Sequence, residues 1–187
     1  EQDRDQLPFE QRNDVVIVRN GVELDDFKPS SDSKSVEVLF AGNMGYPPNV
    51  EGAIFLEKEV MPLVRMKIPT AKLMLAGARP DQKVKDLASE LTEVTGWVDD
   101  IRDCYAKAKV FVAPMMIGTG LQNKLLEAMA MEIPCVTSTL ANNAIQAKPD
   151  EEILIAKSPN EYAEHILSLL ADRTKSDSIA QAGHTLV

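Results

Sequence analysis

The chain has 187 residues and a formal net charge of −9, and 44% of its residues are hydrophobic. This length fits one domain, or one domain with a remnant of another, and allows a sizeable hydrophobic core. The acidic balance argues against nucleic acid or an anionic membrane surface as the main partner. No apolar run approaches the roughly 18 residues that a membrane-spanning helix requires. Cys104 and Cys135 form no Cys-x-x-Cys pair, so we expect two reduced, buried thiols in a cytoplasmic protein.

Residues 1–33 are expected to be a lead-in and an interdomain linker. Residues 1–14 are polar and aperiodic, and a short β-branched run, Val15–Val18, is followed by the turn pair Asn20-Gly21. Residues 27–33 are typical of a linker. We therefore predict that the folded domain spans residues 34–187.

From residue 34 onward, short apolar strands alternate with helical patterns. The last predicted helix begins with a capping box, in which Ser158 is the N-cap, Pro159 is the first helical residue and Glu161 is the third. This alternation predicts an α/β fold with a doubly wound, Rossmann-like parallel sheet. The predicted strands are 36–41, 72–76, 92–95, 110–113, 134–137 and 153–156, and the earlier helices follow Pro47 or span about 81–90 and 101–108.

Several predicted strands end at a glycine or a proline. The carboxyl ends of parallel strands lie along one edge of a sheet, where α/β proteins bind their ligands. Four loops are therefore expected to surround one site large enough for a nucleotide. These loops are residues 42–46, which include Gly42 and Asn43, and residues 77–80, 96–99 and 118–120.

The most informative stretch is Gly118-Thr119-Gly120-Leu121, which follows the strand at 110–113 and opens a helix. Unpaired N–H groups at a helix N-terminus carry partial positive charge, and glycines let the backbone approach a phosphate or a sugar closely. Lys124 and Glu127 are three residues apart and share one face of this helix. The stretch therefore predicts a binding site for a phosphorylated small molecule.

In this order, the motifs resemble the C-terminal, donor-binding half of a retaining GT-B fold glycosyltransferase of the "glycosyl transferases group 1", family 4-like type. The resemblance covers roughly residues 15–187. More narrowly, residues 42–49 with residues 120–124 resemble a subgroup of sugar transferases tied to bacterial exopolysaccharide biosynthesis. The wider family's elements are matched by Asn20-Gly21-Val22-Glu23, Leu39-Phe40-Ala41-Gly42, Thr95-Gly96-Trp97-Val98, Glu127-Ala128-Met129-Ala130 and Ile133-Pro134-Cys135-Val136.

The resemblance implies that the ligand is a nucleotide-diphosphate sugar. Glu127 is then expected to accept hydrogen bonds from the ribose hydroxyls, since a carboxylate can accept from two adjacent donors. The amides near Gly120 and Leu121 are expected to face the donor sugar and the diphosphate. The backbone around Val98 is expected to hold the base.

Two departures from the family pattern affect the charge of the site. Thr119 stands where the wider family has its first glutamate, and residues 42–49 lack the Arg and Lys that neutralise the diphosphate in that family. We expect Lys124, with Arg79, to take over this role. Alternatively, Lys124 forms a structural ion pair with Glu127, and Arg79 is a solvated loop residue.

Other residues also have a structural interpretation. For Thr119, a helix cap is a slightly better interpretation than a sugar contact. For Asn43, a role in shaping its turn and a role in binding are equally good interpretations. Trp97 is expected to pack in the core rather than to stack on a base. Asp99-Asp100 is expected to cap the following helix. Because the predicted ligand loops hold no His or Cys cluster and no Asp-x-Asp, we expect no metal and no other cofactor.

The expected function is transfer of a sugar from a nucleotide-diphosphate donor, with retention of configuration, in polysaccharide biosynthesis. The acceptor, which is a sugar or a lipid-linked molecule, is expected to bind to an N-terminal domain outside this chain. Peripheral membrane association is expected only through that domain. The 187 residues are therefore expected to fold but not to transfer sugar alone. Two alternatives remain, namely an epimerase-like relative that acts on nucleotide sugars and a non-catalytic nucleotide-binding module.

Overall fold

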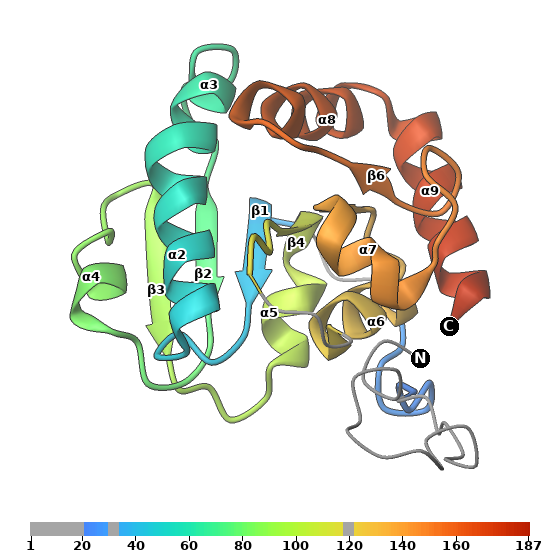
Figure 1. Ribbon diagram of the computed structural model, residues 1–187, viewed down its shortest axis with the longest axis horizontal. Coiled ribbons are helices and arrows are strands. Elements are labelled where there is room, and N and C mark those ends of the chain that lie inside the picture. Colours follow the sequence, from blue (N-terminus) through green and yellow to red (C-terminus); the bar gives the residue numbers. More distant parts are fainter. Residues whose placement is uncertain (1–20, 30–33, 118–121) are drawn as a thin grey trace, which may run out of the picture.

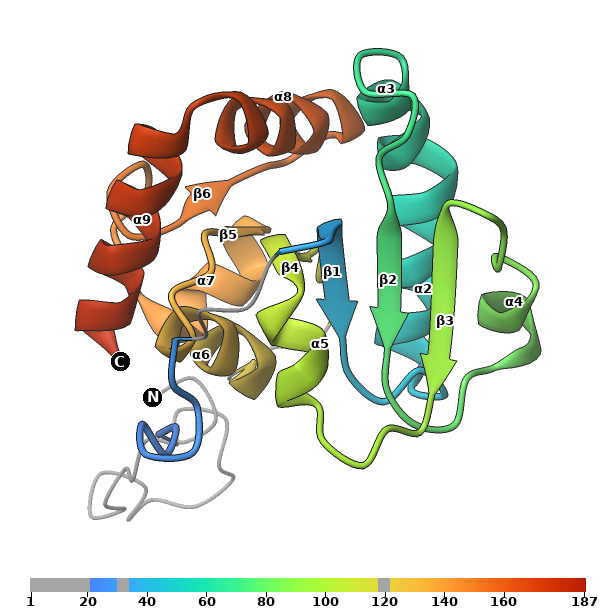
Figure 2. The ribbon, with the colours of Figure 1, turned by 180° about the vertical axis from the view of Figure 1, so that it is seen from behind.

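The computed structural model describes residues 21–29, 34–117 and 122–187, so Val15–Val18 lies outside the described part. Within these residues, six parallel strands form one sheet in the order β3-β2-β1-β4-β5-β6 (Figures 1 and 2). This topology confirms the predicted doubly wound α/β fold. The strands are β1 (Val36–Ala41), β2 (Leu73–Ala76), β3 (Thr92–Gly96), β4 (Ala108–Ala113), β5 (Cys135–Thr137) and β6 (Leu154–Ile155).

The strand order reverses at β1. This strand pairs with β2 on one side, Val38 opposite Leu73, and with β4 on the other, Val38 opposite Val110. The chain builds the sheet outward in both directions from this point, which leaves a crevice beyond the carboxyl ends of β1 and β4. The arrowheads of β1, β2 and β3 point toward the lower edge in Figure 2, where their following loops gather.

Helices cover both faces of the sheet, which explains why its central strands β1 and β4 are apolar apart from Glu37 and Lys109, which pair with each other near the strand starts. Helix α2 (Pro47–Phe55) continues through a wide turn, η2 (Leu56–Val60), into α3 (Met61–Arg65). The wide turn ends two residues before Pro62, which has no backbone N–H to donate to an α-helical hydrogen bond. This helical run covers one face of the sheet, and α5 (Arg102–Ala106) packs against β4 on the other (Figure 2).

Two predicted helices are shorter in the structure. Helix α4 (Gln82–Lys85) replaces the prediction of about 81–90, because the chain turns back where Ser89 and Thr92 bridge before β3. The prediction of 101–108 extends too far because Ala108 already pairs with Val36 in the sheet. The predicted N-cap is confirmed, since the N–H of Glu161 donates to Ser158 Oγ at 3.3 Å at the start of α8 (Pro159–Ala171). The Glu161 carboxylate accepts from the N–H of Lys157 at 2.7 Å and not from that of Ser158, so the reciprocal bond of the capping box is displaced by one residue.

The sequence prediction missed two helices, α7 (Thr139–Ile145) and α9 (Arg173–Leu186). Each begins at a side-chain cap, Ser138 and Asp172 respectively. Only a few of their residues are buried, so the apolar periodicity that reveals a helix is weak in both. Helix α9 packs against α8 and against α6 (Asn123–Ala130), which carries candidate site residues.

Candidate functional site

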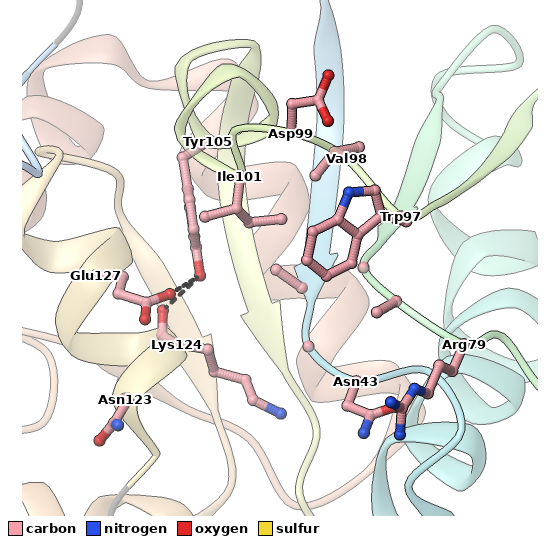
Figure 3. A pocket seen from close by; sticks show the side chains of 14 residues that line it. Asn43, Arg79, Trp97, Val98, Asp99, Ile101, Tyr105, Asn123, Lys124 and Glu127 are labelled. Atoms are coloured by element: carbon pink, nitrogen blue, oxygen red, sulfur yellow. Dashed lines mark hydrogen bonds between the residues drawn. The ribbon is translucent and has the colours of Figure 1, made fainter.

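A cavity of about 660 Å³ opens at the carboxyl edge of the sheet, beside the point where the strand order reverses. Its volume is in the range of small-molecule sites, roughly 300–1,000 Å³. Figure 3 shows its wall, with Glu127 and Tyr105 on one side and Arg79 and Asn43 on the other. The lining residues are Ala41, Gly42, Asn43, Gly77, Ala78, Arg79, Trp97, Val98, Asp99, Ile101, Tyr105, Asn123, Lys124 and Glu127.

The cavity brings together predicted site residues from four separate segments of the chain. They follow β1, β2 and β3 or lie on α6, and are Gly42, Asn43, Arg79, Val98, Lys124 and Glu127. The remaining predicted site residues, Gly118, Thr119, Gly120 and Leu121, lie outside the described residues. Tyr105, Ile101 and Asn123 also line the cavity, although the sequence prediction assigned no role to their side chains. The position of Tyr105 on a predicted helix beside a predicted ligand loop is the sequence signal that could have identified it.

The loops after β1 and β2 cross at two glycines. Gly77 has a φ of +133°, and a Cβ at this position would lie 1.9 Å from the carbonyl oxygen of Gly42. Gly42 has a φ of +151°, and a Cβ there would lie 2.9 Å from Asn49 Nδ2 and 3.2 Å from Lys124 Nζ. Both residues must therefore be glycine for backbone and cation to approach this closely at the cavity floor.

The ammonium of Lys124 lies close to Gly42, in the loop that follows β1. Its Nζ donates to Oδ1 of the buried Asn49 at 2.5 Å and lies 4.9 Å from the ring centroid of Phe40. Burial lowers the pKa of Lys124 to about 8, although the charge of Glu127 opposes the shift. Among the described residues, no ion pair joins Lys124 to Glu127, so the alternative in which the two form a structural ion pair is wrong. The amide of Asn49 reaches the lysine instead.

Glu127 is hydrogen-bonded by a residue of α5. The hydroxyl of Tyr105 donates to Glu127 Oε2 at 2.8 Å and also lies 3.2 Å from the carbonyl oxygen of Lys124 (Figure 3). Burial, followed by the negative charge of Glu127, raises the pKa of Tyr105 well above its ordinary value, so this phenol stays a donor. The carboxylate faces the cavity from the same helix face as Lys124.

Asn43 and Arg79 form the far wall, each in a constrained loop. Asn43 Oδ1 accepts from the N–H of Gly45 at 3.1 Å, and its carbonyl accepts from Asn49 Nδ2 at 2.9 Å. These bonds agree with the prediction that Asn43 shapes its turn. Arg79 is exposed, with a φ of +53° that is uncommon for a residue with a side chain. Its guanidinium lies beside Asn43 at the cavity rim (Figure 3).

Trp97 corrects a prediction. It is 75% exposed and lines the cavity, so it does not pack in the core. It directly follows Gly96, the last residue of β3, at the point where the chain leaves the sheet. The neighbouring Asp100 accepts from the N–H of Arg102, the first residue of α5, at 2.9 Å, although Ile101 stands at the N-cap position itself.

Within the described ranges, no group of three or more His, Cys, Asp or Glu residues is placed to hold a metal ion. None of the described helices is both long enough and apolar enough to cross a membrane. Cys104 and Cys135 are both free and buried, as predicted. The absence of a cofactor and the cytoplasmic location stay predictions.

The fold and the cavity define a Rossmann-like domain with a nucleotide-sized crevice at its switch point. Residues 35–172 match the family described as glycosyl transferases group 1, and the chain belongs to this family. It is also 25% identical over 146 residues to an uncharacterized 44.6 kDa protein in a cps region of Klebsiella pneumoniae. That alignment covers 73% of this chain and 38% of the relative.

Two solved structures show the same fold. HepE from Anabaena, in complex with UDP and glucose, superimposes with a TM-score of 0.73 at 14% identity, over 90% of this chain and 50% of HepE. The C-terminal domain of the group 1 glycosyl transferase LpcC from Francisella tularensis gives a TM-score of 0.65 at 20% identity, over 89% of this chain and 96% of that domain. The chain thus spans half of HepE and 38% of the Klebsiella relative. The predicted boundaries at residues 1–33 and 34–187 stay a prediction.

Proposed function

We propose that this chain is the donor-binding domain of a retaining glycosyltransferase that acts in polysaccharide biosynthesis. The observation that carries the proposal is the convergence of Glu127 and Lys124 with the glycine loops after β1 and β2 in one cavity. The UDP and glucose in the HepE complex support a nucleotide-diphosphate sugar as the donor. The cps-region location of the Klebsiella relative supports a role in polysaccharide synthesis.

In this proposal, Glu127 recognises the pentose of the donor nucleotide. Its carboxylate accepts hydrogen bonds from two adjacent hydroxyls, and it is already on the cavity wall. The backbone around Val98 holds the base, and Trp97 offers an exposed ring beside it. The base therefore lies toward the end of β3, and the diphosphate lies toward α6.

The positive charge for the diphosphate comes from Lys124, with Arg79 across the cavity. Charge builds on the departing diphosphate in the transition state, and a cation held in a partly dry site stabilises it strongly. The proposal also assigns the amides at Gly118, Gly120 and Leu121 to the diphosphate and donor sugar, with Thr119 beside them. Binding is proposed to need no divalent metal, so removal of metal with EDTA is expected to leave nucleotide affinity unchanged.

Calorimetric titration of the 187-residue chain with UDP, GDP and ADP tests donor binding. At least one of the three is expected to bind, and Glu127→Gln is expected to weaken it roughly tenfold or more, since a hydrogen bond to a charged group contributes about 1.5–3 kcal/mol. Glu164→Gln, an exposed carboxylate on α8, is the matched control and should change nothing. Equal affinities of wild type and Glu127→Gln would contradict the proposed role of Glu127.

Transfer is tested separately. The chain by itself is proposed to be inactive, because the acceptor binds to an N-terminal domain outside it. Incubation of a protein that contains both domains with donor and acceptor should give a glycoside whose anomeric configuration, measured by NMR, matches that of the donor. Turnover by these 187 residues alone, or an altered nucleotide sugar formed without acceptor, would count against the proposal.

A further inference from the structure

Tyr105 carries a buried hydroxyl directly behind the carboxylate of Glu127. The side chain is fully buried, yet its oxygen reaches the cavity wall. The hydroxyl has one proton, and its shorter contact, 2.8 Å, is to Glu127 Oε2 rather than to the carbonyl of Lys124 at 3.2 Å. A bond from a neutral donor to a carboxylate is charge-assisted, so the proton is directed mainly at Glu127.

The ring of Tyr105 cannot move easily. Its centroid lies 5.5 Å from that of Phe111 in β4 and 6.2 Å from that of Phe27, which packs edge-on. Phe27 belongs to the segment that precedes the sheet, and this segment is tied to α5 by Arg102, which donates to the carbonyl of Asp26 at 3.1 Å. Aromatic packing on two sides therefore places the hydroxyl at one point in the wall.

This placement has a consequence for Glu127. The carboxylate has two oxygens, and Oε2 is engaged by Tyr105, whereas no described residue donates to Oε1. A glutamate without such a partner would sample several rotamers, and ordering it on binding would cost affinity. With Oε2 anchored, the carboxylate is preorganised to present its remaining acceptor capacity to the cavity.

We propose that Tyr105 is a positioning residue for pentose recognition, which acts on the ligand through Glu127. The inference rests on the proposed function, because it assumes that Glu127 accepts from the nucleotide's hydroxyls. Tyr105 does not touch the ligand in this role. Its effect on affinity must therefore depend on the hydroxyls that Glu127 contacts.

The test compares two ligands, namely whichever of UDP, GDP and ADP binds most tightly and its 2′,3′-dideoxy analogue. Tyr105→Phe keeps the ring packing and removes only the hydroxyl. We expect it to weaken the nucleoside diphosphate roughly threefold to tenfold, the equivalent of ordering one side chain, and to leave the dideoxy analogue unchanged. Tyr162→Phe, a buried tyrosine on α8 whose ring packs on Phe55, is the matched control and should alter neither affinity.

The outcomes separate the inference from the function on which it rests. If Glu127→Gln removes the preference for the hydroxylated ligand but Tyr105→Phe does not change it, the inference is wrong and the proposed function stands. If Tyr105→Phe weakens both ligands equally, its role is structural and the inference is likewise wrong. If Glu127→Gln leaves the preference unchanged, the pentose assignment fails and the inference fails with it. Unchanged dideoxy affinity in Tyr105→Phe also shows that the variant is folded.

Discussion

Nucleotide binding is expected to take up a proton at Lys124. Burial lowers the pKa of this ammonium to about 8, because it is held among Asn49, Phe40 and Met115. A diphosphate bound in the cavity would bring negative charge beside it and raise the pKa back toward the ordinary value of 10.5. In those molecules whose Lys124 was neutral before binding, the side chain would then be protonated in the complex.

The magnitude follows from the pKa. With a value of about 8, Lys124 is neutral in about one tenth of the free molecules at pH 7, about half at pH 8 and about nine tenths at pH 9. The expected uptake per nucleotide bound equals these fractions. The sign is fixed by linkage, because the complex binds more protons than the free protein. Affinity should therefore be nearly constant below about pH 7 and fall above pH 8, approaching tenfold per pH unit.

Calorimetric titration in two buffers of different ionisation enthalpy measures this uptake directly. Lys124→Met should abolish it and weaken binding about tenfold or more, because a charge-assisted contact is lost. Lys157→Met, which removes an exposed lysine, is the control and should behave as wild type. The reasoning is refuted if the wild type takes up no proton at pH 8–9, or if Lys124→Met takes up as many.

Three further variants, with Arg173→Met as a control, test other features. Trp97→Ala should weaken nucleotide binding about tenfold, since stacking on a base contributes roughly 1–3 kcal/mol. It should leave pyrophosphate binding and the melting temperature unchanged. A lower melting temperature would show that the indole has a structural role. Gly77→Ala should lower the free energy of unfolding, measured by urea denaturation, by about 2–6 kcal/mol, because the new Cβ would clash with a carbonyl oxygen at a residue with positive φ. A smaller loss would mean that the loop changes conformation to avoid the clash. Arg65→Met should cost about 3–5 kcal/mol, because it leaves the half-buried Glu57, now 2.8 Å from the guanidinium, without its counter-charge. The exposed Arg173→Met should change stability by less than about 0.5 kcal/mol, and equal losses in both arginine variants would contradict the importance of burial.

Local pattern was sufficient for the fold class and for the position of the cavity. Short strand-forming runs ended by Gly42, Gly77 and Gly96 predicted parallel strands, and parallel strands place their carboxyl ends on one edge. The spacing of Lys124 and Glu127 predicted one helix face. Both inferences depend only on neighbours in sequence and on geometry that every parallel sheet shares.

Interactions across long sequence separations were not predictable from such patterns. Asn49 lies 75 residues from Lys124, and Tyr105 lies 22 residues from Glu127, so no local rule links either pair. The prediction that Trp97 packs in the core was wrong for the same reason. Whether an indole after a strand is buried or exposed depends on which other segments pack over it.

The sequence by itself determined which residues form strands, where glycine is required and which carboxylate and cation share a helix, because these depend on periodicity and backbone sterics. Only the tertiary structure decided the partners of that carboxylate and cation. It placed Tyr105 behind Glu127 and Asn49 against Lys124, because α5 and the β1 loop meet α6 only when the sheet has formed. The burial that lowers the pKa of Lys124 arises from the same packing, since a charge is desolvated by the whole fold and not by its neighbours in the chain.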